Sequence, residues 1–528
     1  MTIGRHRRVG SLRSGRLQHL TDTIDADGSP VDVPSPDPEH GADTFVLGGP
    51  LRLDPRSWRV PNVVAMVLLL GFAMLPVRGL YRAPGSSMEE AFMIVFPRLV
   101  LDGKIPNVDF LHLYGPGSLD ALAGWYWLVG ETLETQRTFG LLQNLGIILA
   151  LYALTRPWGR LASVSAGGIA SLLVMTPIGL AALAWHGAIA LALWSMVFAV
   201  RARTTRHTVD WAVAGLLAGL ALSFRPDMIL AVAMGLAAAG WVHRSIAFKP
   251  VLLWSALGLL PMWIHVAIAG PGPSIEGMVL DPVFELRPGR ELPTPPSFSE
   301  IDGALQAIAE AIPPWYPLPA LPAEKQLFFW FFATVAVALA VPLVTWRLRR
   351  TDPSSPRLDL LFAAGLFGLG ILPQAMQRPD STHLAWVSMV SWPLLVALIA
   401  HLVERRGSGP SRRPGLTGAA VVVALMLVVA PFYTFRYYAL HTRVGIGDLP
   451  LPFLVERGEK RFWFGNPEVA RSLNEIIPVL DELSEPGDRL IVGPADLSRT
   501  VYSVVSIDFL YPEVVPGTFY VEMDPGLA

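Results

Sequence analysis

The sequence has no cysteine among its 528 residues. That absence excludes a disulfide framework, a thiol nucleophile and a metal site with cysteine ligands. Charge is scarce as well, because 41 basic and 43 acidic side chains make up only 16% of the chain, whereas a soluble domain has about 25%. So few charges argue against a soluble enzyme with one core, and the lack of a basic face argues against a nucleic-acid partner.

Apolar residues are abundant instead, at 52% of the chain, and the mean hydropathy is +0.45. Charge-free intervals recur at nearly the length that crosses a bilayer core of about 30 Å. They are 61–77, 138–155, two within 161–200, 211–224, 228–242, 250–270, 326–346, 360–377, 384–403 and 414–434. We therefore expect an all-α polytopic membrane protein with about eleven transmembrane helices.

Residues 115–130 decide the topology. This stretch contains Asp120 and is short for a span, so it is either an ordinary short span or an interfacial or re-entrant helix. In the interfacial reading, the basic clusters share one side of the membrane with the basic N-terminal tail. They are Arg156 and Arg160; Arg201, Arg203 and Arg206; Arg244 and Lys249; Arg347, Arg349 and Arg350; and Arg405, Arg406, Arg412 and Arg413. Because basic loops stay in the cytoplasm, we expect an interfacial helix with Trp125, Tyr126 and Trp127 at headgroup level.

This topology places the N-terminus in the cytoplasm and the C-terminus outside, in a bacterial inner (plasma) membrane. Residues 1–58 have no apolar run and are expected to form a disordered cytoplasmic tail. The transmembrane domain then covers 59–434, with outer loops at 78–135 and 271–325.

Residues 435–528 are expected to form a small extracytoplasmic α/β lobe. Asn466 opens a predicted helix at 467–483, and a strand-like run follows at 488–493. Asp524 and Pro525 look like the start of another helix, which leaves open whether the lobe is complete.

An acidic pair, Glu89 and Glu90, lies in the first outer loop, where charge near membrane depth is costly. Ser86 or Ser87 with a glutamate three residues later is a capping-box pattern, which opens a helix to residue 101 and accounts for one glutamate only. We expect this helix to lie in the interface, and its lipid-facing residues to be Phe92, Met93, Phe96 and Leu99. The other glutamate then faces an outer cavity, and we predict it to be catalytic, with Glu89 slightly preferred.

The same loop continues to Asp109 and His112 after a turn at Gly103 and Pro106. Asp109 is either an acceptor-binding or metal-binding carboxylate, or a cap for its own turn. We group His112 with it as a candidate acceptor or metal ligand.

Two predicted outer turns repeat the tripeptide Arg-Pro-Asp, beginning at Arg225 and Arg378. In the simpler interpretation, each arginine neutralises the aspartate of its own hairpin. The second hairpin also has Asp380 and His383 within six residues of Arg378, which favours a functional role. An arginine at the outer leaflet can hold a phosphate, and Asp380 with His383 can orient a hydroxyl or share a divalent cation.

Together these residues predict a substrate that arrives within the membrane and reacts at its outer surface. A sugar linked to a polyprenyl phosphate fits, with a carboxylate as general base and arginines on the departing phosphate. One displacement of this kind inverts the anomeric centre.

The first-loop pattern, an acidic pair followed by LDGKIPNVDFLHLYGPG, resembles that of GT-C glycosyltransferases, the membrane class that includes protein O-mannosyltransferases. The resemblance implies a lipid-linked sugar donor, a cell-envelope glycan, lipid or protein as acceptor, and a base from the acidic pair. It leaves open a divalent cation, Mg²⁺ or Mn²⁺, which some members use. This chain has Glu89-Glu90 where Asp-Glu is common, so the identity of the base stays open.

Transport is the main alternative function, as a multispan transporter or a lipid flippase, and a non-catalytic assembly or scaffold protein of the cell envelope is a third. Transporters place ionisable groups near the midplane and often have two similar halves. In this sequence the charges gather toward one face, which favours glycosyl transfer. Only four lysines, Lys104, Lys249, Lys325 and Lys460, occur among the basic residues. That scarcity suggests a high-GC bacterium, in which mannose or arabinose on polyprenyl phosphate is a natural donor.

Overall fold

A computed structural model describes residues 60–85, 89–175, 179–241, 244–296, 321–406, 413–493 and 504–523. The predicted tail at 1–58, the Ser86 and Ser87 caps and the helix start at Asp524 lie outside these described residues.

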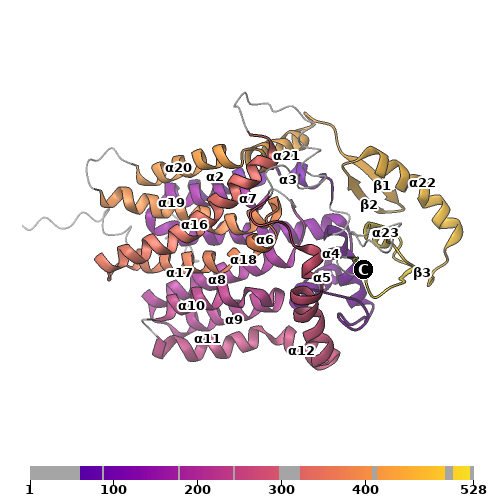
Figure 1. Cartoon of the computed structure of the whole chain (residues 1–528), viewed down its shortest axis with the longest axis horizontal. Coiled ribbons are helices and arrows are strands. Elements are labelled where there is room, and N and C mark those ends of the chain that lie inside the picture. Colours follow the sequence, from indigo (N-terminus) through magenta and orange to yellow (C-terminus); the bar gives the residue numbers. More distant parts are fainter. Residues whose placement is uncertain are drawn as a thin grey trace, which may run out of the picture. The chain divides into compact units, whose positions relative to one another are not determined.

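Every predicted span falls on one or more helices (Figure 1). They are α2 (Val60–Met74), α6 (Leu133–Thr155), α7 (Arg160–Val174), α8 (Ala184–Thr205), α9 (Thr208–Phe224), α10 (Ile229–Gly240), α11 (Arg244–Gly258), α12 (Leu260–Ala269), α16 (Ala323–Thr351), α17 (Pro356–Gly370), α18 (Leu372–Gln377), α19 (Ser381–Arg405) and α20 (Pro414–Val429). Neighbouring helices pack along their lengths, as α8 does on α9 and α19 on α7.

The count of eleven crossings is not confirmed. Within the described part of the chain, 6 helical segments are long and apolar enough to cross a membrane, or up to 8 if two bent pairs count as one span each. One pair is α11 with α12, bent by 46°, and the other is α20 with the helical turns after it, bent by 98°. The helices at 160–174, 208–224 and 226–240 are apolar but shorter.

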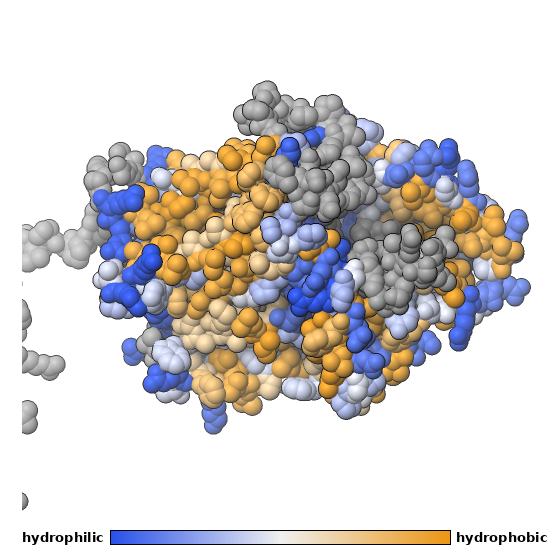
Figure 2. Space-filling view, viewed as in Figure 1, coloured by the Kyte–Doolittle hydropathy of each residue, from blue (hydrophilic) through white to orange (hydrophobic). Residues whose placement is uncertain are grey.

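Apolar side chains cover much of the helical surface, as Figure 2 shows for one face. Val67, Leu68 and Leu253 are more than 60% exposed. Exposed aliphatic side chains in such numbers are unfavourable in water, whereas lipid solvates them. The surface is therefore that of a multi-pass membrane protein.

Arginine pairs with acidic residues at one end of the helices. Arg203 at the end of α8 and Arg349 near the end of α16 both contact Asp359 at the start of α17, and Arg357 lies 2.9 Å from Glu404 at the end of α19. The first residues of α8 and α19 lie at the opposite end, because 22 helical residues span about 33 Å.

Helix α4 (Glu89–Leu101) is a core element, which corrects the prediction that one face of it meets lipid. Phe92, Met93 and Phe96 are at most 1% exposed, and Leu99 is 6% exposed. The helix packs against α5 (Pro116–Val129) and against α23 (Ser506–Leu510) of the C-terminal part. Protein instead of lipid therefore covers its apolar side chains.

Helix α5 is the predicted interfacial segment, and it is 14 residues long. Of its three aromatic residues only Trp127 is strongly exposed, at 77%. Tyr126 is buried, and its hydroxyl donates a hydrogen bond to the Met93 carbonyl at 2.8 Å. The expectation that all three rings lie among headgroups was therefore wrong for Tyr126, because α4 covers it.

Residues 447–523, the C-terminal segment, follow α21 (Tyr437–Ile446). An antiparallel hairpin joins β1 (Phe453–Arg457) to β2 (Lys460–Phe464), and β3 (Arg489–Leu490) pairs in parallel with β4 (Val515–Pro516). The predicted helix is α22 (Pro467–Leu483), and the Asn466 side chain accepts hydrogen bonds from the Glu468 and Val469 amides, as expected for an N-cap.

Candidate active site

A cavity of about 180 Å³, the Glu89 cavity, lies at the end of the helices opposite the arginine pairs. Its walls come from segments far apart in the sequence: the start of α4, the loop before α5, the two Arg-Pro-Asp turns, α14 (Arg287–Arg290) and the end of the C-terminal segment. Its charged and polar lining residues are Glu89, Tyr114, Arg225, Asp227, Arg287, Arg290, Gln374, Gln377, Arg378, His383 and Glu522.

The structure separates the two adjacent glutamates. Glu89 is half-buried and lines the cavity. Glu90 is 2% exposed and accepts two hydrogen bonds from Arg137, at 2.7 and 2.8 Å. Arg137 also donates to the carbonyls of Leu80, Tyr81 and Ala83. Since all five of its N–H groups are used, the Glu90–Arg137 pair has the character of a structural bridge.

Arg225 of the first Arg-Pro-Asp tripeptide pairs with the aspartate of its own hairpin and also lies at the Glu89 cavity. Its guanidinium forms a bidentate pair with Asp227, at 2.9 and 2.6 Å, and also lines the cavity. The faces of Tyr114 and Trp185 lie under it, with the guanidinium carbon 4.5 and 4.9 Å from the ring centroids. Gln374 donates to the same aspartate at 2.6 Å. These contacts hold one cation in a defined position.

The second tripeptide has a similar pair with a histidine added. Asp380 caps α19 by accepting from the His383 amide, and its carboxylate lies 2.8 Å from His383 Nδ1 and 3.2 Å from Arg378 Nε. The pKa of Asp380 is below its ordinary value: burial would raise it, but the charges of His383 and Arg378 outweigh that effect. Arg378 and His383 line the cavity, with the His383 ring against Trp386.

The two tripeptides share a backbone conformation that the sequence explains. Arg225 has φ −141° and ψ 92°, and Arg378 has φ −145° and ψ 86°. A residue before proline is excluded from the helical region, so each arginine ends its helix and turns the chain at the mouth of the bundle.

Sequence reasoning missed part of the cationic wall. Arg287 and Arg290 lie on α14, which follows the π-helix η5 (Glu276–Glu285). Their place in a Pro-rich loop hid them, although two arginines three residues apart in LRPGRE on the predicted outer side were an available signal. With Arg225 and Arg378, four arginines border the cavity that Glu89 enters.

Two predicted ligands lie elsewhere. Asp109 is exposed and caps its own turn, accepting from the Ile105 amide at 2.7 Å. His112 is 2% exposed, behind Tyr114, whose ring meets it edge-on at 5.6 Å. Burial lowers the pKa of His112 to about 3, and the charges of His265 and Arg225 act in the same direction. His112 is therefore a neutral packing residue beneath the cavity wall.

The described residues do not fit a divalent-cation site. No three His, Asp or Glu side chains among them come together as metal ligands. Both oxygens of Glu90 contact Arg137, and those of Asp380 contact His383 and Arg378. Asp109 lies outside the cavity.

No family model and no curated protein matches the sequence. Among solved structures, the chain is similar to ArnT from Cupriavidus metallidurans bound to undecaprenyl phosphate, with 14% identity and a TM-score of 0.45 over 86% of this chain and 89% of that one. It is also similar to the apo Archaeoglobus fulgidus oligosaccharyltransferase, with 13% identity and a TM-score of 0.40 over 85% of this chain and 64% of that one.

Proposed function

We propose that the chain is a membrane glycosyltransferase that moves a sugar from a polyprenyl-phosphate donor to an acceptor hydroxyl on the extracytoplasmic face, with inversion. Glu89 is the general base, and Arg225 and Arg378, with Arg287 and Arg290, hold the donor phosphate. The acceptor is a glycan, lipid or protein of the cell envelope.

One observation carries the proposal: the Glu89 carboxylate lines the same cavity as four arginines, which come from the two Arg-Pro-Asp turns and from α14. The cavity lies at the helix end away from the arginine pairs of Arg203, Arg349 and Arg357. If basic ends face the cytoplasm, the cavity opens on the outer side, at the depth of a lipid phosphate.

The residues that line the Glu89 cavity supply a general base and cations for the proposed transfer. Glu89 takes the proton of the acceptor hydroxyl as its oxygen attacks the anomeric carbon, and the bond from that carbon to the phosphate oxygen breaks. The electron pair leaves with the polyprenyl phosphate, whose growing negative charge the arginines stabilise through paired N–H donors.

The test is the donor itself. Cells in which the gene for this protein is deleted should accumulate a polyprenyl-phosphate sugar, which mass spectrometry of lipid extracts identifies. Glu89→Gln cannot accept the proton, so turnover of that donor should fall about 10²- to 10⁴-fold, and the lipid should accumulate as in the deletion.

Asp102→Asn is the matched control, because Asp102 is an exposed carboxylate just after the same helix. It should restore wild-type lipid levels. Wild-type turnover by Glu89→Gln would overturn the assignment of the base. Uptake of a labelled solute by sealed vesicles that contain no lipid-linked donor would favour the transporter.

A further inference from the structure

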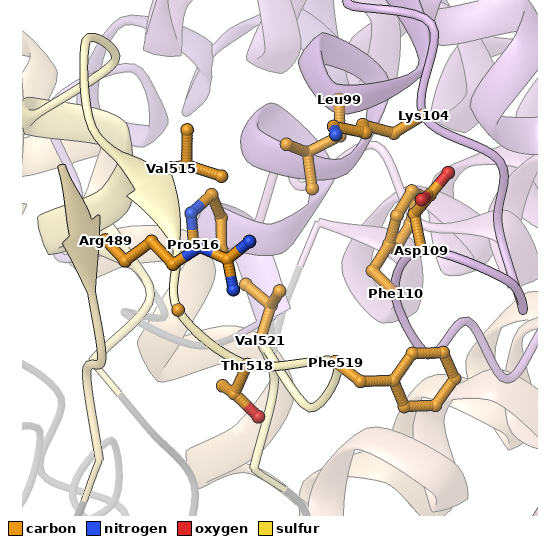
Figure 3. A pocket seen from close by; sticks show the side chains of 11 residues that line it. Leu99, Lys104, Asp109, Phe110, Arg489, Val515, Pro516, Thr518, Phe519 and Val521 are labelled. Carbon is orange, nitrogen blue, oxygen red and sulfur yellow. The ribbon is translucent and has the colours of Figure 1, made fainter. Parts of the chain in front are cut away.

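A second cavity, of about 200 Å³, lies between the first outer loop and the C-terminal segment, and we name it the Lys104 cavity (Figure 3). Leu99, Lys104 and Asp109 stand on one side of it, and Arg489 with Val515 and Pro516 on the other. None of its lining residues belongs to the Glu89 cavity. The two cavities are therefore separate spaces.

Backbone hydrogen bonds hold the walls in place. The Leu111 amide donates to the Phe519 carbonyl at 2.9 Å, joining the loop to the C-terminal segment. On the far side, the Gly517 amide donates to the Leu490 carbonyl at 2.7 Å. A Cβ at Gly517 would meet Ile491 at 2.6 Å, so glycine allows this close approach. A site built this way is formed before a ligand arrives.

The charges at this cavity favour an anion. Lys104 and Arg489 are exposed, and within the described part of the chain neither has an acidic side chain at ion-pair distance. One oxygen of Asp109 is bound by its own turn at 2.7 Å. Leu99, Val515 and Val521 add apolar wall. The chemistry suits a carboxylate or phosphate on a partly apolar body, such as an acidic sugar unit.

The two cavities are neighbours along both chain segments. Phe110 lines the Lys104 cavity, and Leu113, three residues on, lines the Glu89 cavity. Val521 and Glu522, adjacent in sequence, line one cavity each. Three extended residues span at most about 10 Å, so the linings of the two cavities lie within the length of a few polymer units of each other.

We infer that the Lys104 cavity binds the acceptor at a unit close to the one that receives the sugar, and that this unit carries a carboxylate or phosphate held by Lys104 and Arg489. The inference rests on the proposed function and adds the substrate class, an anionic envelope glycan. The cavity is smaller than the roughly 300–1,000 Å³ of a site for a whole drug-sized ligand, as expected for one unit of a chain.

Transfer by the full-length protein in proteoliposomes tests it. The donor is the polyprenyl-phosphate sugar that accumulates in the deletion strain, and the acceptor probe is the glycan fraction of the envelope from that strain. Lys104→Gln with Arg489→Gln should raise KM for this fraction about tenfold or more, with the same thermal unfolding and the same affinity for polyprenyl phosphate. Arg471→Gln, an exposed arginine of α22, should leave KM unchanged.

A probe of charge supplies a second readout that needs no transfer. Because the chain has no cysteine, Thr518→Cys is a unique thiol at the cavity. It should react faster with an anionic than with a cationic methanethiosulfonate reagent, and the rate ratio should fall about fivefold when both cations become glutamine.

An unchanged KM in the double variant, while Glu89→Gln remains inactive, overturns the acceptor subsite and leaves the proposed function intact. Activity of Glu89→Gln overturns the proposed function first. Loss of binding to phosphatidylglycerol vesicles in the double variant, with an unchanged KM, identifies a lipid headgroup site and also overturns the inference.

Discussion

At the scale of single residues, the adjacent glutamates of α4 have opposite surroundings. Glu89 enters a cavity with four arginines, whereas Glu90 is buried against a fully used Arg137. Breaking a buried ion pair by removing one charge leaves the other charge uncompensated. The two positions therefore separate stability from activity.

Glu90→Gln should lower the free energy of unfolding by about 3–5 kcal/mol, because the buried charge of Arg137 loses its partner. Glu89→Gln should leave stability nearly unchanged. Thermal unfolding in detergent measures both. A stable, inactive Glu90→Gln protein beside a fully active Glu89→Gln protein would reverse the assignment of the two residues.

Asp508 in α23 should make the stability of the protein depend on pH. Burial raises its pKa to about 7, although the charge of Arg98 opposes the rise. The folded state then holds a proton that the unfolded chain releases near the ordinary aspartate pKa of 3.8. Stability from this group is therefore complete below about pH 4, falls as pH rises, and is lost above about pH 7.

A rise of that size corresponds to about 4 kcal/mol at most. Asp508→Asn should remove this loss, so that thermal stability between pH 5 and 8 becomes flatter than in the wild type. Asp488→Asn, an exposed carboxylate of the C-terminal segment, is the control. A wild-type pH profile in the Asp508 variant contradicts the assignment.

At the scale of elements, a close contact joins η5 to the first outer loop. A Cβ at Gly277 would lie 2.0 Å from Asn107 Nδ2. Asn107 is buried and donates a hydrogen bond to the His112 carbonyl at 2.7 Å. It also has φ +64°, a strained backbone for a non-glycine residue. The turn that leads to the cavity wall therefore depends on this glycine.

Gly277→Ala should destabilise the protein by about 1–3 kcal/mol, because Asn107 must leave its hydrogen bond to make room. Gly272→Ala is the matched control, since a Cβ there meets nothing within 4 Å. Thermal unfolding and donor turnover measure the two effects. Equal stability of the two variants would contradict the predicted contact.

Elements were predictable where one local pattern determines them. The helix at 467–483 with its Asn466 cap is confirmed, and each apolar interval falls on helix. The apolar face of α4 was assigned wrongly to lipid. Lipid tails and the protein interior are both apolar, so the sequence pattern of an apolar helix face does not show which of the two covers it. Glu89, Arg225, Arg378 and His383 share a cavity, while Asp109 lies outside it. The fold of the first outer loop determines which of these residues line the cavity, and a local sequence pattern does not contain that information. The roles of the residues that line it remain predictions.

At the scale of the whole molecule, the proposed reaction depends on which side of the membrane each helix end faces. Arginines paired with Asp359 and Glu404 gather at one end, and the Glu89 cavity lies at the other. A polyprenyl-phosphate donor can reach the cavity from the outer leaflet only if that end is extracytoplasmic.

Labelling of single introduced cysteines measures most directly which side of the membrane each helix end faces, because the chain has no cysteine of its own. Leu292 lies just beyond the cavity wall at Arg290, and Ser354 lies between α16 and α17 at the arginine-paired end. The two test variants are Leu292→Cys and Ser354→Cys. In intact cells a membrane-impermeant maleimide should label residue 292 and should reach residue 354 only after permeabilisation. Labelling of residue 354 from outside, with residue 292 protected until the cells are opened, would contradict the proposed reaction at the outer face.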